Sequence, residues 1–150
     1  MNHGGRIRQV ASVVLLKSDG SSALLQLRDE KPGLSHSGKW VFPGGHCEAD
    51  EPPEDCARRE FFEETDYRLD QIYPLISIID DRVPELKPYR LSLFLALYDG
   101  KQSIQCHEGR AIEFLFRQTE HINLVPDYLV TVWDLAILAF RLHQLNRPIN

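Results

Sequence analysis

Residues 44–67 of the chain read GGHCEADEPPEDCARREFFEETDY, and this stretch contains three glutamates at helical spacing. Glu60, Glu63 and Glu64 stand at positions i, i+3 and i+4, so a helix would present their carboxylates on one narrow arc. Like charges at these spacings repel each other by about 0.2–0.5 kcal/mol per exposed pair. A divalent cation such as Mg²⁺, which takes oxygen ligands, would reverse the sign of this interaction. An acidic cluster alone favours the other interpretation, an ordinary solvated helix face.

The residues before the glutamates have the features of a helix start and of a loop that can approach a ligand. The two prolines at 52–53 suit the first turn of a helix, which needs no backbone donor. The Pro-Gly-Gly run at 43–45 predicts a tight loop whose backbone can come close to a ligand or a metal. Arg59 can reach Glu63 along the helix or Glu51 in the loop, and so join the two.

This combination of loop, arginine and glutamates resembles the Nudix box, G-x5-E-x7-R-E-U-x-E-E-x-G-U, in which U is apolar. The positions that match the motif are Gly45, Glu51, Arg59, Glu60, Phe61, Glu63, Glu64 and Tyr67. The departure is Asp66, which stands where the family has glycine. That glycine would end the helix in a left-handed conformation, which aspartate tolerates better than most residues. We therefore expect a small cost in stability and an intact site.

The resemblance implies a hydrolase that uses Mg²⁺, with Mn²⁺ able to substitute. Glu60 and Glu64 would be the main metal ligands, with Glu63 assisting. The residues implied for the metal are Glu60, Glu63, Glu64 and Gly44 or its neighbour Gly45. The residues implied as structural supports are Glu51 and Arg59. The residues implied for catalysis are Glu63, Glu64 and Glu108, with Glu63 or Glu108 as the base.

Glu108 lies outside the box, on a segment that precedes a short predicted strand. Glu108-Gly109 resembles the family's E-G-x-x-x-E-W region, in which a glutamate adds a metal ligand or activates water. Glu113 is the second candidate for this role and Glu120 the third. The alternative for Glu108 is a surface glutamate in a loop, and we expect His107 beside it to have no catalytic role.

Composition limits the class of protein. The chain has 150 residues, 43% of them hydrophobic and 26% charged, which is ordinary for one globular domain spanning residues 1–150. A formal charge of −5 argues against a nucleic-acid partner that is bound by neutralising phosphates. No apolar run approaches the roughly 20 residues that span a bilayer, so we expect a cytoplasmic protein without a membrane partner. We expect all three cysteines, Cys47, Cys56 and Cys106, to be reduced thiols.

Apolar and β-branched runs alternate with turn residues along the whole chain. These patterns predict strands at 7–17, 23–28, 39–42, 71–79, 89–98 and 112–116, with helices at 53–65 and 127–144. Residues 89–98 are apolar on both faces, which predicts a central strand. The last helix has an apolar stripe formed by Val130, Val132, Leu135, Leu138 and Leu142. The class is α/β (α+β), and the resemblance implies a Nudix α/β/α sandwich with a mixed sheet between helices.

Three residues are candidates for substrate binding. Arg28 ends a predicted strand near the point where several Nudix enzymes contact a substrate phosphate; a surface arginine is the equal alternative. Asp127 and Tyr128 precede or begin the last helix, where nucleotide-binding relatives contact the base by a hydrogen bond or by stacking. Capping of the helix is the alternative for Asp127. We expect His36 to lie at the surface, and loop 80–88 to border the substrate pocket.

The implied reaction is hydrolysis of a diphosphate linkage in a nucleoside diphosphate joined to another group. Nucleoside triphosphates, including oxidised ones, come first as substrates, giving a monophosphate and pyrophosphate. Nucleotide sugars and dinucleoside polyphosphates are the next substrates. A non-catalytic nucleotide-binding or regulatory module is the alternative from a different class. The resemblance also allows a homodimer.

Overall fold

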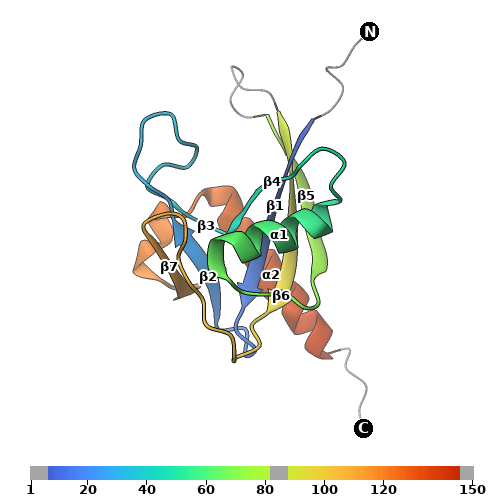
Figure 1. Cartoon of the computed structure of the whole chain (residues 1–150). Helices are drawn as coiled ribbons and strands as arrows, with labels where there is room; N and C mark the ends of the chain where they lie inside the picture. The colour runs from blue at the N-terminus through green and yellow to red at the C-terminus, as the bar shows by residue number, and fades with distance from the viewer. Residues whose placement is uncertain (1–6, 82–87, 146–150) are drawn as a thin grey trace.

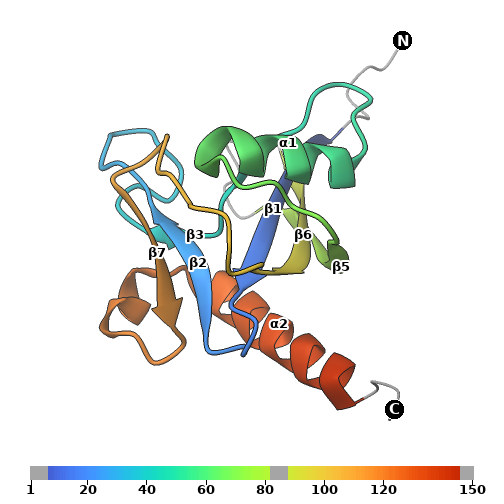
Figure 2. The same cartoon turned by 60° about the horizontal axis from the view of Figure 1, so that its bottom comes forward.

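The computed structural model describes residues 7–81 and 88–145, in which seven strands form one mixed sheet with a helix on each face (Figures 1 and 2). The strands are β1 (Arg8–Leu16), β2 (Ser22–Leu27), β3 (Trp40–Val41), β4 (Gly44–His46), β5 (Tyr73–Asp80), β6 (Tyr89–Leu97) and β7 (Ala111–Phe116). The helices are α1 (Pro53–Thr65), the short 3₁₀ helix η1 (Glu120–Leu124) and α2 (Asp127–Leu145). This is the predicted α/β/α arrangement with a mixed sheet between helices.

Strand β1 divides its side chains between two cores because successive residues of a strand point to opposite faces. Ala11, Val13 and Leu15 are fully buried on the face that α1 covers. Val14 and Leu16 are fully buried on the face that α2 covers. Each of these valine and leucine side chains contributes about 1.5–3 kcal/mol when it leaves water. Both faces of β1 therefore stabilise the sheet, and its position fixes that of both helices.

The sheet order is β3-β2-β1-β6-β5, with β4 paired to β1 and β7 paired to β2. Strands β1 and β6 run parallel over their full lengths, from Arg8 opposite Tyr89 to Leu16 opposite Leu97. Strand β6 lies between β1 and β5, which confirms its predicted central place. Strands β1 and β2 pair at Leu16 and Ala23, next to the turn that joins them. Beyond this point β1 pairs with β4 instead.

Strand β4 was not predicted, because two glycines after a proline favour a loop. The structure instead pairs Gly44–His46 antiparallel with residues 10–12 of β1. Gly44 allows this close approach, since a Cβ atom there would overlap the Ala11 carbonyl and Ser12. The missing side chain thus lets the β4 backbone pair closely with β1, in a place where it also contacts α1.

Helix α1 has the predicted bounds. Pro53 occupies its first turn, with Glu54 and Asp55 beside it. Asp66 ends the helix in the left-handed conformation, with φ 62° and ψ 7°, and its N–H donates to the Phe62 carbonyl at 2.8 Å. Aspartate therefore serves as the helix cap at the position where the motif has glycine.

The predicted apolar stripe of α2 is only partly correct. Leu138 and Leu142 are 52% and 49% exposed. The residues that α2 buries against the sheet are Leu129, Val132, Trp133, Ala136 and Phe140. The helix is apolar on more than one side, so periodicity alone could not identify the side that faces the sheet.

The prediction of three reduced cysteines is wrong for two of them. Cys47, just after β4, forms a disulfide with Cys56 in α1, and their Cα atoms are 5.2 Å apart. The chain turns back between β4 and α1, which brings the two Cα atoms into the range that a disulfide requires. Cys106 is free and exposed.

One sequence expectation concerns residues that the structure does not fully describe. The middle of loop 80–88, residues 82–87, lies outside the described part of the chain. Within residues 7–81 and 88–145, no helix is both long enough and apolar enough to cross a bilayer. The single domain over residues 1–150 stays a prediction.

Candidate active site

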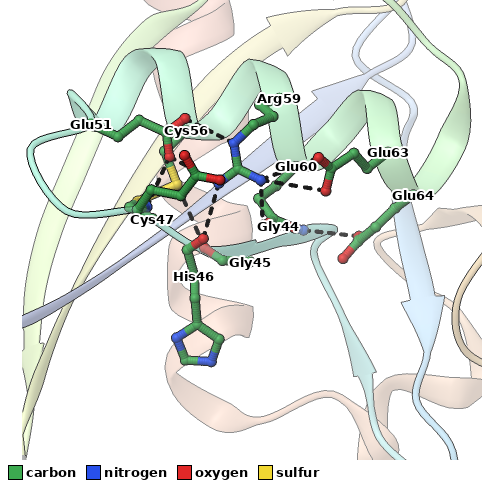
Figure 3. Close-up of polar contacts among 11 residues, drawn as sticks. Gly44, Gly45, His46, Cys47, Glu51, Cys56, Arg59, Glu60, Glu63 and Glu64 are labelled. Atoms are coloured by element: carbon green, nitrogen blue, oxygen red, sulfur yellow. Dashed lines mark hydrogen bonds and ion pairs between the residues drawn. A yellow bond between two sulfur atoms is a disulfide. The ribbon is translucent and has the colours of Figure 1, made fainter.

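Two glutamates of α1 face the backbone of β4 (Figure 3). Glu64 is buried, with 5% of its surface exposed, and accepts a hydrogen bond from the Gly44 N–H at 3.2 Å. Gly45 lies against the Glu60 carboxylate so closely that a Cβ atom on Gly45 would overlap it. The Gly44 and Gly45 backbone and the two carboxylates therefore form one compact group of oxygen atoms and N–H donors.

Arg59 joins the loop before α1 to the helix itself. Its Nε and Nη2 donate to the two Glu51 carboxylate oxygens at 2.8 and 2.9 Å, and Nη2 also donates to the His46 carbonyl at 3.1 Å. Nη1 lies 3.0 Å from Glu60 and 3.3 Å from Glu63. The hydrogen bonds from Arg59 lower the pKa of Glu51 to about 2. Both predicted reaches of Arg59, to Glu51 and to Glu63, are present (Figure 3).

The loop before β7 brings Glu108 to the same place. This loop runs alongside the end of α1, where the His107 N–H donates a hydrogen bond to the Glu64 carbonyl at 3.0 Å. The Gln26 amide of β2 donates to the Glu108 carbonyl at 2.6 Å, which fixes the loop from the other side. His107 itself pairs with the helix cap Asp66 at 2.9 Å.

Burial and neighbouring carboxyl groups raise the pKa of two of the glutamates, Glu60 and Glu64. Burial, together with the neighbouring Glu108 carboxyl, raises the pKa of Glu64 to about 9. Burial also raises the pKa of Glu60, although Arg59 offsets part of this effect. Carboxyl groups held in this way favour a proton or a cation.

The raised pKa makes the metal-free protein less stable as the pH rises. The unfolded chain releases the Glu64 proton near the ordinary pKa of 4.5, whereas the folded chain keeps it up to about 9. Stability therefore falls between these two values, by at most about 1.4 kcal/mol per pH unit from this group, and levels off above them. We expect the melting temperature in EDTA to fall from pH 5.5 to 8.5. The melting temperature of Glu64→Gln should fall less steeply over this pH range, and equal slopes for both proteins would contradict the prediction.

A cavity of about 1140 Å³ extends from the glutamates across the sheet. Its acidic part is lined by Glu60, Glu64 and Glu108, together with Gly44 and Gly45. Its basic part is lined by Arg8, Arg28 and His46, where burial and then the two arginines lower the pKa of His46. Its aromatic part is lined by Phe42, His36 and Tyr128. The cavity thus offers acidic, basic and aromatic side chains to one ligand.

The structure places most of the predicted site residues on this cavity, but not all of them. Arg28 lines it, and the Arg28 Nε atom is buried without a hydrogen-bond partner. Tyr128 also lines it, whereas Asp127 is exposed in the first turn of α2 and does not. Glu63 is 56% exposed, pairs with Arg59 and is not among the lining residues. The remaining candidates, Glu113 and Glu120, are exposed on β7 and η1 and do not line it.

Sequence reasoning missed one residue pair in the cavity. The expectation that His36 is a surface residue is wrong, because the residue is half-buried and lines the cavity. Its ring Nε2 lies 2.9 Å from the Tyr128 hydroxyl. His36 has φ 55°, a left-handed conformation that turns the loop toward α2. The two residues are 92 positions apart, so no local pattern indicates that they meet.

The donor set near β4 fits a hard divalent cation. Carboxylate oxygens and a backbone carbonyl are the ligands that Mg²⁺ prefers, and the glutamates repel one another unless a cation or a proton lies between them. Among the described residues, the one group of three acidic, histidine or cysteine side chains whose ligand atoms all lie within 4.8 Å of one another is a different one, Cys47, Glu51 and Cys56. That group does not fit a metal, because its sulfurs form a disulfide and Glu51 is occupied by Arg59.

Comparison with known proteins gives one family match and many similar folds. The family model described as NUDIX domain matches residues 6–132. An Ap4A hydrolase from C. elegans superposes with a TM-score of 0.72 at 19% identity, over 91% of this chain and 99% of that one. A MutT NUDIX hydrolase from Burkholderia pseudomallei gives a TM-score of 0.67 at 20% identity, over 89% of this chain and 97% of that one. A MutT protein from Methanosarcina mazei Go1 gives a TM-score of 0.70 at 18% identity, over 94% of this chain and 96% of that one. At these identities the structural likeness shows the fold alone.

Proposed function

Because the chain belongs to the NUDIX family, we propose that it is a metal-dependent hydrolase of a diphosphate linkage in a nucleoside diphosphate derivative. The observation that carries this proposal is the convergence of Glu60, Glu64 and Glu108 on one cavity beside the β4 backbone. A polyphosphate resists a nucleophile because its own negative charge repels it. A site for this reaction needs ligands for a cation and room for phosphates beside them, and the three glutamates and the volume of the cavity support this assignment.

Glu60, Glu64 and the Gly44 or Gly45 carbonyl would hold Mg²⁺, with Mn²⁺ able to substitute. The bound metal neutralises phosphate charge and lowers the pKa of a coordinated water. Glu108 lines the cavity and would take the proton of the attacking water. Glu63 is the other candidate base, but its exposure and its pairing with Arg59 favour a supporting role.

Glu51 and Arg59 would act as supports for the metal ligands. Arg59 contacts Glu60 directly and reaches β4 through the His46 carbonyl. It therefore restricts both the helix and the strand that would contribute ligands. Residues that orient metal ligands in this way commonly change metal affinity by about 10–100-fold when they are replaced.

The substrate that the cavity supports best is a nucleoside triphosphate, ordinary or oxidised, giving a monophosphate and pyrophosphate. Tyr128 would stack on the base, and Asp127, although exposed, is close in sequence and would hydrogen-bond a base edge. The volume of about 1140 Å³ also leaves room for a dinucleoside polyphosphate, the class that the C. elegans neighbour's description names. Nucleotide sugars and a non-catalytic nucleotide-binding module are the further alternatives. A homodimer stays a prediction.

The test of this function is a product screen by mass spectrometry. The purified protein is incubated with Mg²⁺ and a panel of nucleoside triphosphates, oxidised triphosphates, nucleotide sugars and dinucleoside polyphosphates, with Glu64→Gln in parallel. We expect a monophosphate and pyrophosphate from at least one triphosphate, and none from the variant. Cleavage of another class alone would move the assignment to that class. No cleavage, with thermal stabilisation by a nucleotide still present, would support the binding module.

Arg28 should contribute to substrate binding more than to turnover. Its buried Nε atom has no hydrogen-bond partner in the described structure, and Arg28 lines the same cavity as the glutamates. A hydrogen bond from a charged group to a phosphate contributes about 1.5–3 kcal/mol. We expect Arg28→Ala to raise KM for the substrate found by the screen about 10-fold and to change kcat less. Arg58→Ala on the exposed side of α1 is the control. Equal KM values for both variants would exclude Arg28 from the substrate site.

A further inference from the structure

The Cys47–Cys56 disulfide lies directly behind the backbone that faces the glutamates. Cys47 follows β4, and Cys56 lies in the second turn of α1. The Cys56 sulfur is 3.8 Å from the Gly45 carbonyl oxygen, which is a candidate metal ligand under the proposed function (Figure 3). The disulfide therefore contacts the backbone of the site, although neither cysteine lines the cavity.

Strand β4 has only three residues, so its position depends on what holds each end. At its start, the Val13 N–H of β1 donates to the Pro43 carbonyl at 3.0 Å. At its end, Cys47 N–H donates to the Gln9 carbonyl of β1 at 2.9 Å. These bonds fix β4 relative to the sheet. Arg59, through the His46 carbonyl, and the disulfide are the ties between this end of β4 and α1 among the described contacts.

The distance between β4 and α1 decides whether the oxygen atoms of both can bind one cation. Gly44 N–H bonds Glu64, and Gly45 lies against Glu60, so a small shift of α1 separates both pairs. Mg²⁺ requires near-ideal octahedral geometry and tolerates such a shift poorly. We propose that the Cys47–Cys56 disulfide positions β4 against α1, and that opening it with a dithiol weakens metal binding by this site. The proposal rests on the metal site of the proposed function.

The exposure of the two sulfurs sets the direction of the exchange. Cys47 is half-buried beside the exposed residues 48–50, whereas Cys56 is fully buried. A thiolate of a dithiol such as dithiothreitol would attack the Cys47 sulfur, and the Cys56 sulfur would leave and take up a proton. The second thiol then displaces Cys47 from the mixed disulfide. In total the protein gains two electrons and two protons, and the dithiol becomes a cyclic disulfide.

The experiment measures Mn²⁺ binding by calorimetry before and after treatment with dithiothreitol, with the reductant removed anaerobically by gel filtration. We expect one free thiol before treatment and three after it, and a dissociation constant for Mn²⁺ that rises about 10-fold. Cys106→Ser is the matched control, since it removes the free thiol and should respond as the wild type does. Cys47→Ser should bind weakly in both states.

A purely structural disulfide would give a different result. It would change the melting temperature but leave the Mn²⁺ dissociation constant equal in both redox states, which would overturn the proposal. Three free thiols in the untreated, denatured protein would also overturn it. If Cys47→Ser does not fold, the reduced wild-type protein still provides the comparison, after circular dichroism has verified its fold.

Failure of the proposed function is distinguishable from failure of this inference. Thiol-sensitive Mn²⁺ binding without hydrolysis of any compound would leave the inference intact and remove the function. If hydrolysis occurs, the half-saturating Mg²⁺ concentration should rise on reduction while kcat at saturating Mg²⁺ stays within about twofold, because positioning affects occupancy first. Hydrolysis with an unchanged Mg²⁺ requirement would remove the inference and keep the function.

Discussion

Glu64→Gln should lower turnover by about 10³-fold or more while the protein stays folded. Glutamine has nearly the same shape, and its carbonyl oxygen can still accept the hydrogen bond from the Gly44 N–H. It lacks the negative charge that holds a divalent cation, and loss of several kcal/mol of charge stabilisation corresponds to a rate loss of this size. Because the pKa of Glu64 is raised to about 9, the metal-free side chain is protonated at neutral pH, and a neutral amide replaces a neutral acid.

The measurement is kcat at saturating Mg²⁺ on the substrate identified by the product screen, with the melting temperature in EDTA alongside. Glu120→Gln is the matched control, since Glu120 is an exposed glutamate on η1 that does not line the cavity. We expect the control to keep wild-type turnover. Turnover of Glu64→Gln within tenfold of the wild type would contradict the assignment of Glu64. A much lower melting temperature of the variant would mean that the Glu64 side chain is needed for stability of the fold.

Gly45→Ala should lower kcat/KM about 100-fold with a much smaller loss of stability. Its new Cβ atom would overlap the Glu60 carboxylate, which is the movable end of a side chain. Glu60 can rotate away at little cost to the fold, but it then leaves the position from which it would bind a metal. A displacement of about 1 Å in a reacting group commonly costs 10²-fold in rate. The half-saturating Mg²⁺ concentration should rise together with this loss.

Two other glycines separate a local effect on the site from a general effect of replacing glycine. Gly44→Ala would meet the backbone of β1 and should destabilise the protein, because backbone cannot move aside as a side chain does. Gly100→Ala enters open space at φ 72° and should cost about 1 kcal/mol through backbone strain, without loss of activity. Wild-type kinetics for Gly45→Ala would show that Glu60 does not need its present position.

The features that the sequence predicted well depend on local chemistry. The bounds of α1 follow from the prolines at its start and from Asp66 at its end, and both act within one turn of the helix. The two apolar faces of β6 identified a central strand, because only burial on both sides stabilises such a pattern. The contact of Arg59 with Glu51 and Glu63 follows from reach along a helix and across a short loop.

The features that could not be predicted from the sequence depend on contacts between distant residues. β4 exists because β1 lies beside two glycines, and no property of Gly44–His46 itself indicates a strand. The Cys47–Cys56 disulfide needs two Cα atoms 5.2 Å apart, a distance that the sequence does not contain. The contact between His36 and Tyr128 joins a loop to a helix 92 residues later. In each case the tertiary fold supplies the partner.

The parallel pairing of β1 with β6 bears on when the cavity can form during folding. Arg8 lies opposite Tyr89, so the long segment between β1 and β6 must close into a loop before the pairing of these two strands contributes stability. Long-range parallel pairing of this kind slows folding compared with local hairpins. Glu108 lies beyond both strands in the sequence, so the full set of glutamates needs a segment that follows this central pair. During synthesis, a ribosome-bound chain would lack the proposed base, Glu108, until the segment after β6 has emerged.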